Sequence, residues 1–345
     1  MSSAATAALA GSPAPEPLSV LMVTNMFPSP DAPHRGSFVR DQVEALQRRR
    51  DVEIELFAFD PGLRNYPLAA RELRRRYRGR RFDVVHAHFG LTAWPALLAR
   101  VGPVAVTMHG NDLFHPRSRA ITRAALPFVA LPAVVSRAFG ELVPGAGTSQ
   151  RVAVLPCGID LDRFRPIPRR AARAQLGLDP DEPCLLFPHD PPRPLKRFDR
   201  ARALAGDVRL LTLGRVDPAE VPLWHNAANA VLVPSQAEGF GLAVIEASAC
   251  DVPALGTPVG IHPLVLDGIE GSLCAPWDEG LWRRALAPHL AAADPRVRGR
   301  ARAEIFSAER MAGRMVAAWR ELAAEGSGVE PSRSEPRRRR RVRPR

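Results

Sequence analysis

Lysine is almost absent from this chain: Lys196 is the only lysine among 48 basic residues, and arginine supplies all the others. A lysine retained where arginine serves everywhere else indicates a place that needs a compact point charge. Cysteine is also scarce, and Cys157, Cys184, Cys250 and Cys274 form no Cys-x-x-Cys pair. This spacing argues against a structural zinc site and is typical of a reducing compartment such as the cytoplasm.

Long apolar runs are missing too. No stretch of about eighteen uninterrupted apolar residues occurs, so the sequence predicts no membrane-spanning helix. Residues 1–17 lack the basic start and apolar middle of a signal peptide, and their Ala, Ser and Pro content predicts disorder. We therefore expect a cytoplasmic protein.

Positive charge is abundant but unevenly placed. The formal net charge is +12, and much of it lies in an Arg-rich tail that follows Pro336. No aromatic residue follows Pro331, whereas binding of single-stranded nucleic acid uses aromatic side chains beside basic ones. We expect residues 326–345 to be disordered and attracted to an anionic membrane surface, where each basic residue contributes about 1 kcal/mol. Loose tethering to nucleic acid is the alternative; we expect no specific nucleic-acid partner.

The length of 345 residues suits two domains, each with its own core. Apolar runs of strand length alternate with amphipathic segments, beginning with Leu18 to Thr24, which is typical of parallel α/β sheets. We expect a first domain over 18–165, a second over 166–305, and a final helix over 306–325 that crosses back to the first domain. In such sheets, ligands bind outside the carboxyl ends of the strands.

The most informative stretch runs from Ser235 to Ala247, with the sequence SQAEGFGLAVIEA. It reads as a loop and helix after a strand, Ala230 to Val233. Glycines at the start of a helix let the backbone approach a ligand, and the free amides of the first turn favour an anion. Glu238 and Glu246, with seven residues between them, can accept hydrogen bonds from hydroxyls. The pattern indicates a ligand that carries both phosphate and hydroxyl groups.

This stretch, with Val252 to Gly260 after it, resembles the donor-site signature of the group 1 family of retaining, nucleotide-sugar-dependent glycosyltransferases. The resemblance implies the GT-B fold, in which two doubly wound, Rossmann-like α/β domains face each other across a cleft. It implies transfer of a hexose-type sugar from a nucleotide diphosphate sugar, UDP- or GDP-linked, to a lipid-linked, polysaccharide or small-molecule acceptor with retention of configuration. Assembly of cell-envelope polysaccharide would fit, as would peripheral attachment to the membrane, and no further cofactor is implied.

Alternative functions exist on the same fold. They are a nucleotide-sugar epimerase, a phosphorylase, or a non-catalytic nucleotide-sugar-binding protein. Product analysis without an acceptor would separate the first two from a transferase, and an intact Glu238 and Lys196 argue against the third.

The second domain holds most of the candidate site residues. Arg193 and Lys196 follow the strand Cys184 to Phe187, and two cations at a strand-to-helix turn can neutralise a diphosphate. A solvated basic turn is the alternative. The resemblance assigns to the diphosphate Arg193, Lys196, Gly239, Phe240 and Gly241. It assigns Glu246 to the ribose hydroxyls, and Glu238 to the donor-sugar hydroxyls or the anomeric centre.

The first domain contributes two candidate sites. Arg35, Gly36 and Ser37 lie in the loop after the first strand, which in the family borders the acceptor and the donor phosphates; an ordinary surface loop is the alternative. His109 and Gly110 end the strand Val104 to Met108, and the family's equivalent histidine reaches the transferred sugar. We therefore predict that Glu238, His109 and Lys196 form the catalytic group.

Two patterns suggest a metal, and we interpret neither that way. His86 and His88 alternate on a strand but have no evident third ligand. Asp160 and Asp162 resemble the metal pair of another glycosyltransferase fold, yet their surroundings match the group 1 interdomain hinge, where we expect Asp160 to cap a turn. We predict no metal.

The sequence departs from the family pattern at three places. His189 follows Pro188 where a glycine usually precedes the basic pair, Asp251 replaces the glycine after the helix, and His262 lies where a second glycine would follow Gly260. The first change bears on the register of Arg193, whereas the other two bear on the fit around the sugar ring and leave the nucleotide end unaffected.

Overall fold

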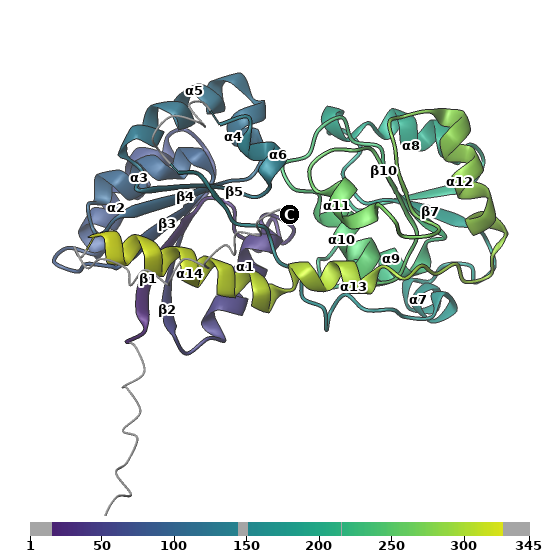
Figure 1. Cartoon of the computed structure of the whole chain (residues 1–345), viewed down its shortest axis with the longest axis horizontal. Coiled ribbons are helices and arrows are strands. Elements are labelled where there is room, and N and C mark those ends of the chain that lie inside the picture. Colours follow the sequence, from purple (N-terminus) through teal and green to yellow (C-terminus); the bar gives the residue numbers. More distant parts are fainter. Residues whose placement is uncertain (1–15, 144–150, 215, 327–345) are drawn as a thin grey trace, which may run out of the picture.

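The structure is a computed structural model that describes residues 16–143, 151–214 and 216–326. Its two α/β domains lie side by side (Figure 1), and each contains one sheet whose strands are all parallel. The expected fold class is confirmed. Most of the two segments expected to be disordered, and the whole Arg-rich tail after Pro336, lie outside the described residues.

The first domain has a six-stranded sheet in the order β2-β1-β3-β4-β5-β6. Its elements are β1 (Leu18–Thr24), α1 (Ser37–Gln47), β2 (Val52–Ala58), α2 (Asn65–Arg76), β3 (Val84–His88), η1 (Gly90–Thr92), α3 (Ala93–Ala99), β4 (Val104–Met108), α4 (Asn111–Phe114), α5 (Pro116–Ala125), η2 (Leu126–Phe128), β5 (Leu131–Val134), α6 (Arg137–Gly140) and β6 (Ala153–Val154).

The second domain has a five-stranded sheet in the order β11-β10-β9-β7-β8. Its elements, and those that follow it, are α7 (Arg169–Leu176), β7 (Cys184–Phe187), η3 (Pro194–Lys196), α8 (Phe198–Ala205), β8 (Arg209–Thr212), α9 (Val221–Ala227), β9 (Ala230–Val233), α10 (Leu242–Ala249), β10 (Ala254–Gly256), α11 (His262–Leu266), β11 (Leu273–Cys274), α12 (Glu279–Ala291), α13 (Arg300–Ala303), η4 (Glu304–Phe306) and α14 (Ala308–Gly326).

The central strands are buried on both faces, which explains their nearly continuous apolar sequences. All five residues of β3 and all four of β9 are buried. Strands covered by helices on both sides have no solvated face to carry alternating polar residues. The carboxyl ends of these strands are therefore left as the places where polar side chains gather.

The last helix, α14, lies across the first domain (Figure 1). Its buried residues Met311, Met315 and Trp319 belong to the same apolar cluster as Val20 and Met22 of β1. The outgoing and returning chains are hydrogen bonded, from Ile159 N to Phe306 O and from Ala308 N to Ile159 O, both at 2.9 Å. Within the described part of the chain, no helix is long and apolar enough to span a bilayer. The domain bounds stay a prediction, and the two sheets lie on either side of residue 165.

Candidate active site

The signature loop links β9 to α10. Ser235 to Gly241 leave the end of β9, and Gly241 caps α10 with φ 111° and ψ 51°. A side chain there would be strained by this backbone, and its Cβ would also press against the ring of His262, 2.7 Å away. Glycine at this position lets the chain turn sharply into α10.

Lys196 and Glu238 form an ion pair at this turn. Lys196 Nζ lies 2.7 Å from Glu238 Oε1 and 2.6 Å from Oε2, and the two side chains are 10% and 7% exposed. Ser235 Oγ donates a third hydrogen bond to Glu238 Oε1 at 2.8 Å. Gln236 N donates to Leu195 O, which holds the two loops together. The structure thus brings the only lysine of the chain onto the first carboxylate of the signature.

Burial and charge act in opposite directions on this pair. Burial disfavours the charged carboxylate, but Lys196 and the neighbouring imidazoles outweigh it and lower the pKa of Glu238 to about 2. Burial lowers the pKa of Lys196, and Glu238 opposes that shift. Glu238 is therefore ionised at neutral pH, and it depends on Lys196 for its counter-charge.

Two histidines complete the surroundings of Glu238. His189 Nε2 lies 3.7 Å from Glu238 Oε1, and the His262 ring lies beside Gly241. His262 Nδ1 donates to Thr257 O at 2.8 Å, so Nε2 is left as an acceptor. Burial lowers the pKa of both imidazoles, and Nε2 of each is buried without a hydrogen-bond partner among the described residues. The two histidines that replace family glycines are thus packed around the first signature carboxylate.

The remaining second-domain candidates lie farther into solvent. Arg193 is exposed, yet it is close enough to Lys196 to lower the pKa of that lysine. Glu246, on the second turn of α10, has a 20% exposed carboxylate that lies 3.2 Å from Nε2 of the buried His225. These positions leave Arg193 and Glu246 available to a ligand.

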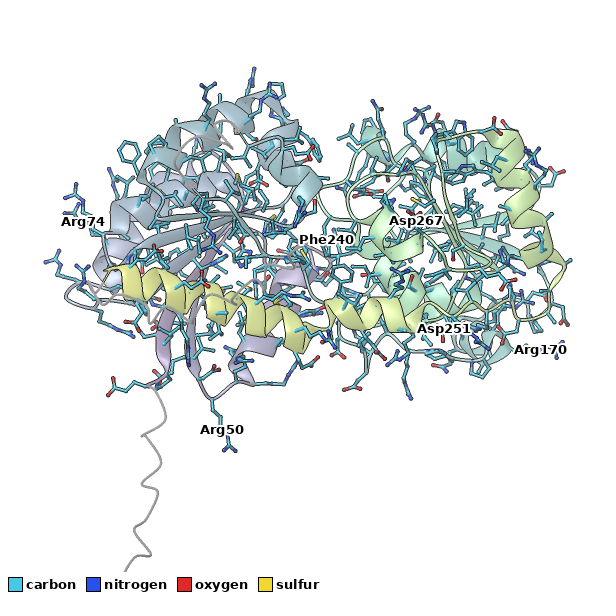
Figure 2. The ribbon with its side chains drawn as sticks, in the orientation of Figure 1. Arg50, Arg74, Arg170, Phe240, Asp251 and Asp267 are labelled. Carbon is cyan, nitrogen blue, oxygen red and sulfur yellow. The ribbon has the colours of Figure 1, made fainter. Side chains whose placement is uncertain are left out.

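The two domains meet directly at the signature loop. Ser136, at the end of β5, donates from Oγ to Gly239 O at 2.8 Å, and a Cβ added at Gly239 would overlap the carbonyl oxygen of His109. Phe240 lies at the junction of the two halves (Figure 2), where its ring packs on Phe306 with a centroid distance of 5.7 Å. The backbone of His109 is therefore next to the donor signature, and the absence of a side chain at Gly239 makes this approach possible.

Three histidines line the same end of the first sheet. His88 Nδ1 and His109 Nε2 are 3.0 Å apart, and their rings stack. Trp319 Nε1 donates to His86 Nδ1 at 2.8 Å, so the neutral His86 ring donates from Nε2 to Thr107 Oγ1 at 2.9 Å. Burial lowers the pKa of all three, that of His88 to about 3. No group of three or more His, Cys, Asp or Glu side chains in the described residues could hold a metal ion.

Asp112 supports the loop that carries His109. Its buried carboxylate accepts hydrogen bonds from the backbone N–H groups of Gly90, His109 and Gly110. Burial raises its pKa, and these three donors oppose that effect. The Asp112 side chain therefore holds the His109–Gly110 turn at the end of β4 through hydrogen bonds to its backbone.

The loop residues Arg35, Gly36 and Ser37 lie at the start of α1. Gly36 caps the helix with φ 61°, and a Cβ there would overlap the carbonyl oxygen of Met26. Arg35 Nη1 lies 3.4 Å from Asp60 Oδ1 after β2. The backbone conformation and the close carbonyl of Met26 thus explain why residue 36 is a glycine. Arg35 is a partly exposed cation at the carboxyl edge of the sheet.

Two of the sequence hypotheses about aspartates can be compared with the structure. Asp160 Oδ1 accepts from the N–H groups of Asp162 and Arg163, so the expected turn cap is confirmed. Asp251 adopts φ 54°, the conformation in which glycine is usual, and its Oδ1 accepts from Gly299 N and Arg300 N. The Asp251 side chain therefore caps the start of α13.

Sequence reasoning missed several residues at this junction. They are Ser136, Ser235 and His225, already described, and the pair Asn25 and Tyr66, in which Asn25 Nδ2 donates to Tyr66 Oη at 2.8 Å. Asn25 directly follows β1 and Ser136 lies two residues after β5, and that position was the signal that could have identified them. His225 and Tyr66 lie on helices and carried no such signal.

Two parallel α/β domains that meet at the carboxyl ends of their strands define the GT-B class, and solved structures agree. A sucrose-phosphate synthase from Thermosynechococcus elongatus aligns with a TM-score of 0.69 at 21% identity, over 89% of this chain and 100% of that one. Anabaena HepE, solved with UDP-glucose, aligns with a TM-score of 0.64 at 17% identity, over 90% and 100% of the two chains.

Sequence comparisons define the family. Residues 19–163 match the model described as Glycosyltransferase Family 4, and residues 188–291 match Glycosyl transferases group 1. The chain belongs to the group 1 glycosyltransferases. Relatives named D-inositol 3-phosphate glycosyltransferase include one from Segniliparus rotundus, 33% identical over 231 residues, and one from Catenulispora acidiphila, 30% identical over 267 residues. These matches span 55% and 60% of this chain, but only 51% and 62% of the relatives' own lengths.

Proposed function

We propose that this protein transfers a hexose-type sugar from a nucleotide diphosphate sugar to a hydroxyl acceptor, with retention of configuration. The observation that carries the proposal is the buried Lys196–Glu238 pair at the glycine-containing loop before α10, where Gly239 packs against the carbonyl oxygen of His109. Family membership and the fold support it.

Stabilisation of the leaving group is the first requirement of such a reaction. Lys196, Arg193 and the amides of Gly239, Phe240 and Gly241 would bind the diphosphate, where fixed positive charge lowers the barrier to departure. Glu246 would accept hydrogen bonds from the ribose hydroxyls. A diphosphate that takes over Lys196 would also release one Glu238 oxygen to accept a hydroxyl of the donor sugar.

The bond changes are those of a front-face substitution. The bond between the anomeric carbon and the diphosphate oxygen breaks, and the acceptor oxygen bonds to the same face of that carbon. The acceptor proton passes to the departing phosphate oxygen. His109 would hold the sugar from the first domain, and contact between the domains would exclude water.

Donor and acceptor classes follow from the similar proteins. A UDP-sugar is our first candidate, since HepE was solved with UDP-glucose, and GDP-sugars are the second. The relatives' names favour a small-molecule acceptor, and lipid-linked or polysaccharide acceptors of the cell envelope are further candidates. A cytoplasmic location, and attachment of the Arg-rich tail to anionic membranes, stay predictions; the tail lies outside the described residues.

The first test measures donor binding. In a thermal-shift panel of nucleoside diphosphates and their sugars, a ligand at about 100 times its dissociation constant stabilises the wild type by about 2.7 kcal/mol. Glu246→Ala should weaken that effect, because it removes the proposed ribose contact. Glu279→Ala, an exposed glutamate on α12, is the matched control and should behave as wild type. The donor assignment is wrong if no nucleotide stabilises the wild type.

The second test follows the product. With the donor found above and a panel of sugar, polyol and lipid-linked acceptors, the new bond should keep the anomeric configuration of the donor, as read by proton NMR couplings. An inverted product would contradict the mechanism, and binding without transfer to any acceptor would favour a non-catalytic protein.

A further inference from the structure

The strand orders of the two sheets locate equivalent positions in the two domains. In the first sheet, β2 lies on one side of β1 and β3 lies on the other. The order in which strands are added to the sheet therefore reverses between β1 and β3. In the second sheet the reversal lies between β7 and β9. Open α/β sheets bind ligands beyond the carboxyl ends of the strands at this reversal. Lys196 and Glu238 follow β7 and β9, and the corresponding residues of the first domain are Asn25 after β1 and His88 at the end of β3.

Asn25, which follows β1, has a buried side chain with an unpaired polar atom. It is 5% exposed, and its Nδ2 donates to Tyr66 Oη at 2.8 Å, while Oδ1 is buried without a hydrogen-bond partner among the described residues. Turning the amide over would exchange the roles of the two atoms and still leave one of them unpaired. A buried unpaired amide group is unfavourable, so its persistence calls for an explanation such as a ligand.

Tyr66 lies beside this unpaired group and is the more exposed member of the pair. It lies in the first turn of α2 and is only partly buried, and its ring packs edge-on against Phe59. Since Asn25 Nδ2 donates to the phenol oxygen, the phenol O–H remains to be donated elsewhere. Asn25 and Tyr66 thus present one hydrogen-bond acceptor and one donor together.

The surroundings of the pair are polar but nearly uncharged. Burial, with the nearby Asp112 adding to it, raises the pKa of Tyr66 to about 12, so the phenol keeps its proton. Burial keeps His88 and His109 neutral, and the Asp112 carboxylate is occupied by three backbone N–H groups. Arg35, on the same edge, is paired with Asp60. Such a site matches a hydroxyl, which both donates and accepts, better than a phosphate, which accepts and carries charge.

From these contacts we infer that Asn25 and Tyr66 form the subsite for a hydroxyl of the acceptor, and that the acceptor presents a neutral polyhydroxyl face, as a sugar or a cyclitol does. This inference rests on the proposed function for the identity of its ligand. Asp112 connects the subsite to the reaction centre, because it acts electrostatically on Tyr66 and holds the backbone of His109.

The two tyrosines of the chain allow a direct binding experiment. Tyr66 begins α2, and Tyr77 follows its last turn with 1% exposure. Protein labelled with 3-fluorotyrosine gives two fluorine resonances, assigned by Tyr66→Phe and Tyr77→Phe. Titration with myo-inositol, with and without UDP, should shift the Tyr66 resonance saturably and leave that of Tyr77 unchanged. Inorganic phosphate that shifts Tyr66 at lower concentration than the polyol would overturn the neutral class of ligand.

Kinetics separate this subsite from the donor site. In an assay with the best polyol acceptor, Tyr66→Phe should raise the acceptor KM about tenfold, the effect of one lost hydrogen bond, with kcat and the nucleotide-induced thermal shift unchanged. Tyr77→Phe is the matched control, and it should change none of them. An unchanged acceptor KM in Tyr66→Phe refutes the subsite while leaving the proposed function standing. If no nucleotide stabilises the wild type, the proposed function fails, and the fluorine titration still decides the subsite.

Discussion

Among single residues, Lys196 has the clearest consequence for both stability and binding. Its ammonium is the counter-charge of a carboxylate that is only 7% exposed, so neither group can be removed alone without leaving a buried charge unpaired. The second domain therefore needs this pair even in the absence of any ligand.

We predict that Lys196→Ala lowers the free energy of unfolding by about 3–5 kcal/mol, measured by urea denaturation, and abolishes the nucleotide-induced thermal shift. The double substitution Lys196→Ala with Glu238→Gln removes the unpaired charge, so it should recover most of the stability but no nucleotide binding. Arg170→Ala is the control, because Arg170 forms an exposed pair with Asp181 and points away from the molecule (Figure 2). A fully stable Lys196→Ala protein would contradict the pairing.

The candidate donor residues could be predicted from the sequence because each lies within one strand-loop-helix unit. Lys196 and Glu238 follow two neighbouring strands, so the topology alone brings them together. The other contacts depend on packing between distant segments: Asn25 and Tyr66 are 41 residues apart, and Ser136 and Gly239 are 103 apart. No local pattern in the sequence encodes which of these side chains meet.

Among the elements, the loop before α10 has to fit against the end of β4. Gly239 has no positive φ, so its backbone would tolerate alanine, and the obstacle is the carbonyl oxygen of His109 in the other domain. A glycine at 239 permits the close contact between the domains, whereas the glycine at 241 permits the positive φ of the turn.

Gly239→Ala should therefore keep the domains apart. We expect kcat to fall about 100-fold, since small displacements of reacting groups have effects of that size. The affinity for the nucleoside diphosphate, which we propose is bound by the second domain, should change by less than about threefold. Gly280→Ala, at the surface in the first turn of α12, provides a matched control with normal kcat. A normal kcat in Gly239→Ala would show that this contact is not part of the reaction.

Sequence patterns predicted the longer elements better than the short ones. The strand Leu18 to Thr24 and the final helix from about residue 307 agree with β1 and α14. The helices α4 and α5, between His109 and Ala133, were not predicted. α5 begins at Pro116 and has three arginines among ten residues, so its apolar pattern is weak, and its packing against η1, where Thr122 meets Gly90, determines its position.

For the molecule as a whole, the buried histidines make stability depend on pH. Burial lowers the pKa of His86, His88, His109, His189 and His262. As pH falls below 6.5 the unfolded chain binds protons that the folded chain does not, so the free energy of unfolding decreases with falling pH. For His88 this decrease continues until the pH reaches about 3.

We predict that urea denaturation at pH 7 and pH 5 shows a substantial loss of stability in the wild type at the lower pH. His88→Gln should reduce that loss by about 2 kcal/mol, the value expected for one histidine whose pKa falls from 6.5 to about 3. His34→Gln, at an exposed histidine, should leave the loss as in the wild type. Equal losses in all three proteins would argue against a neutral, buried His88.

The paired crossing at Ile159 and Phe306 has a consequence for how the molecule can be divided. Both ends of the described chain, β1 and α14, belong to the first domain, and the second domain leaves and returns through two hydrogen-bonded neighbouring segments. In connectivity the second domain is an insertion into the first. The second domain can therefore be exchanged between homologues at two adjacent junctions, and under the proposed function such an exchange would change the donated sugar while the first domain keeps its acceptor preference.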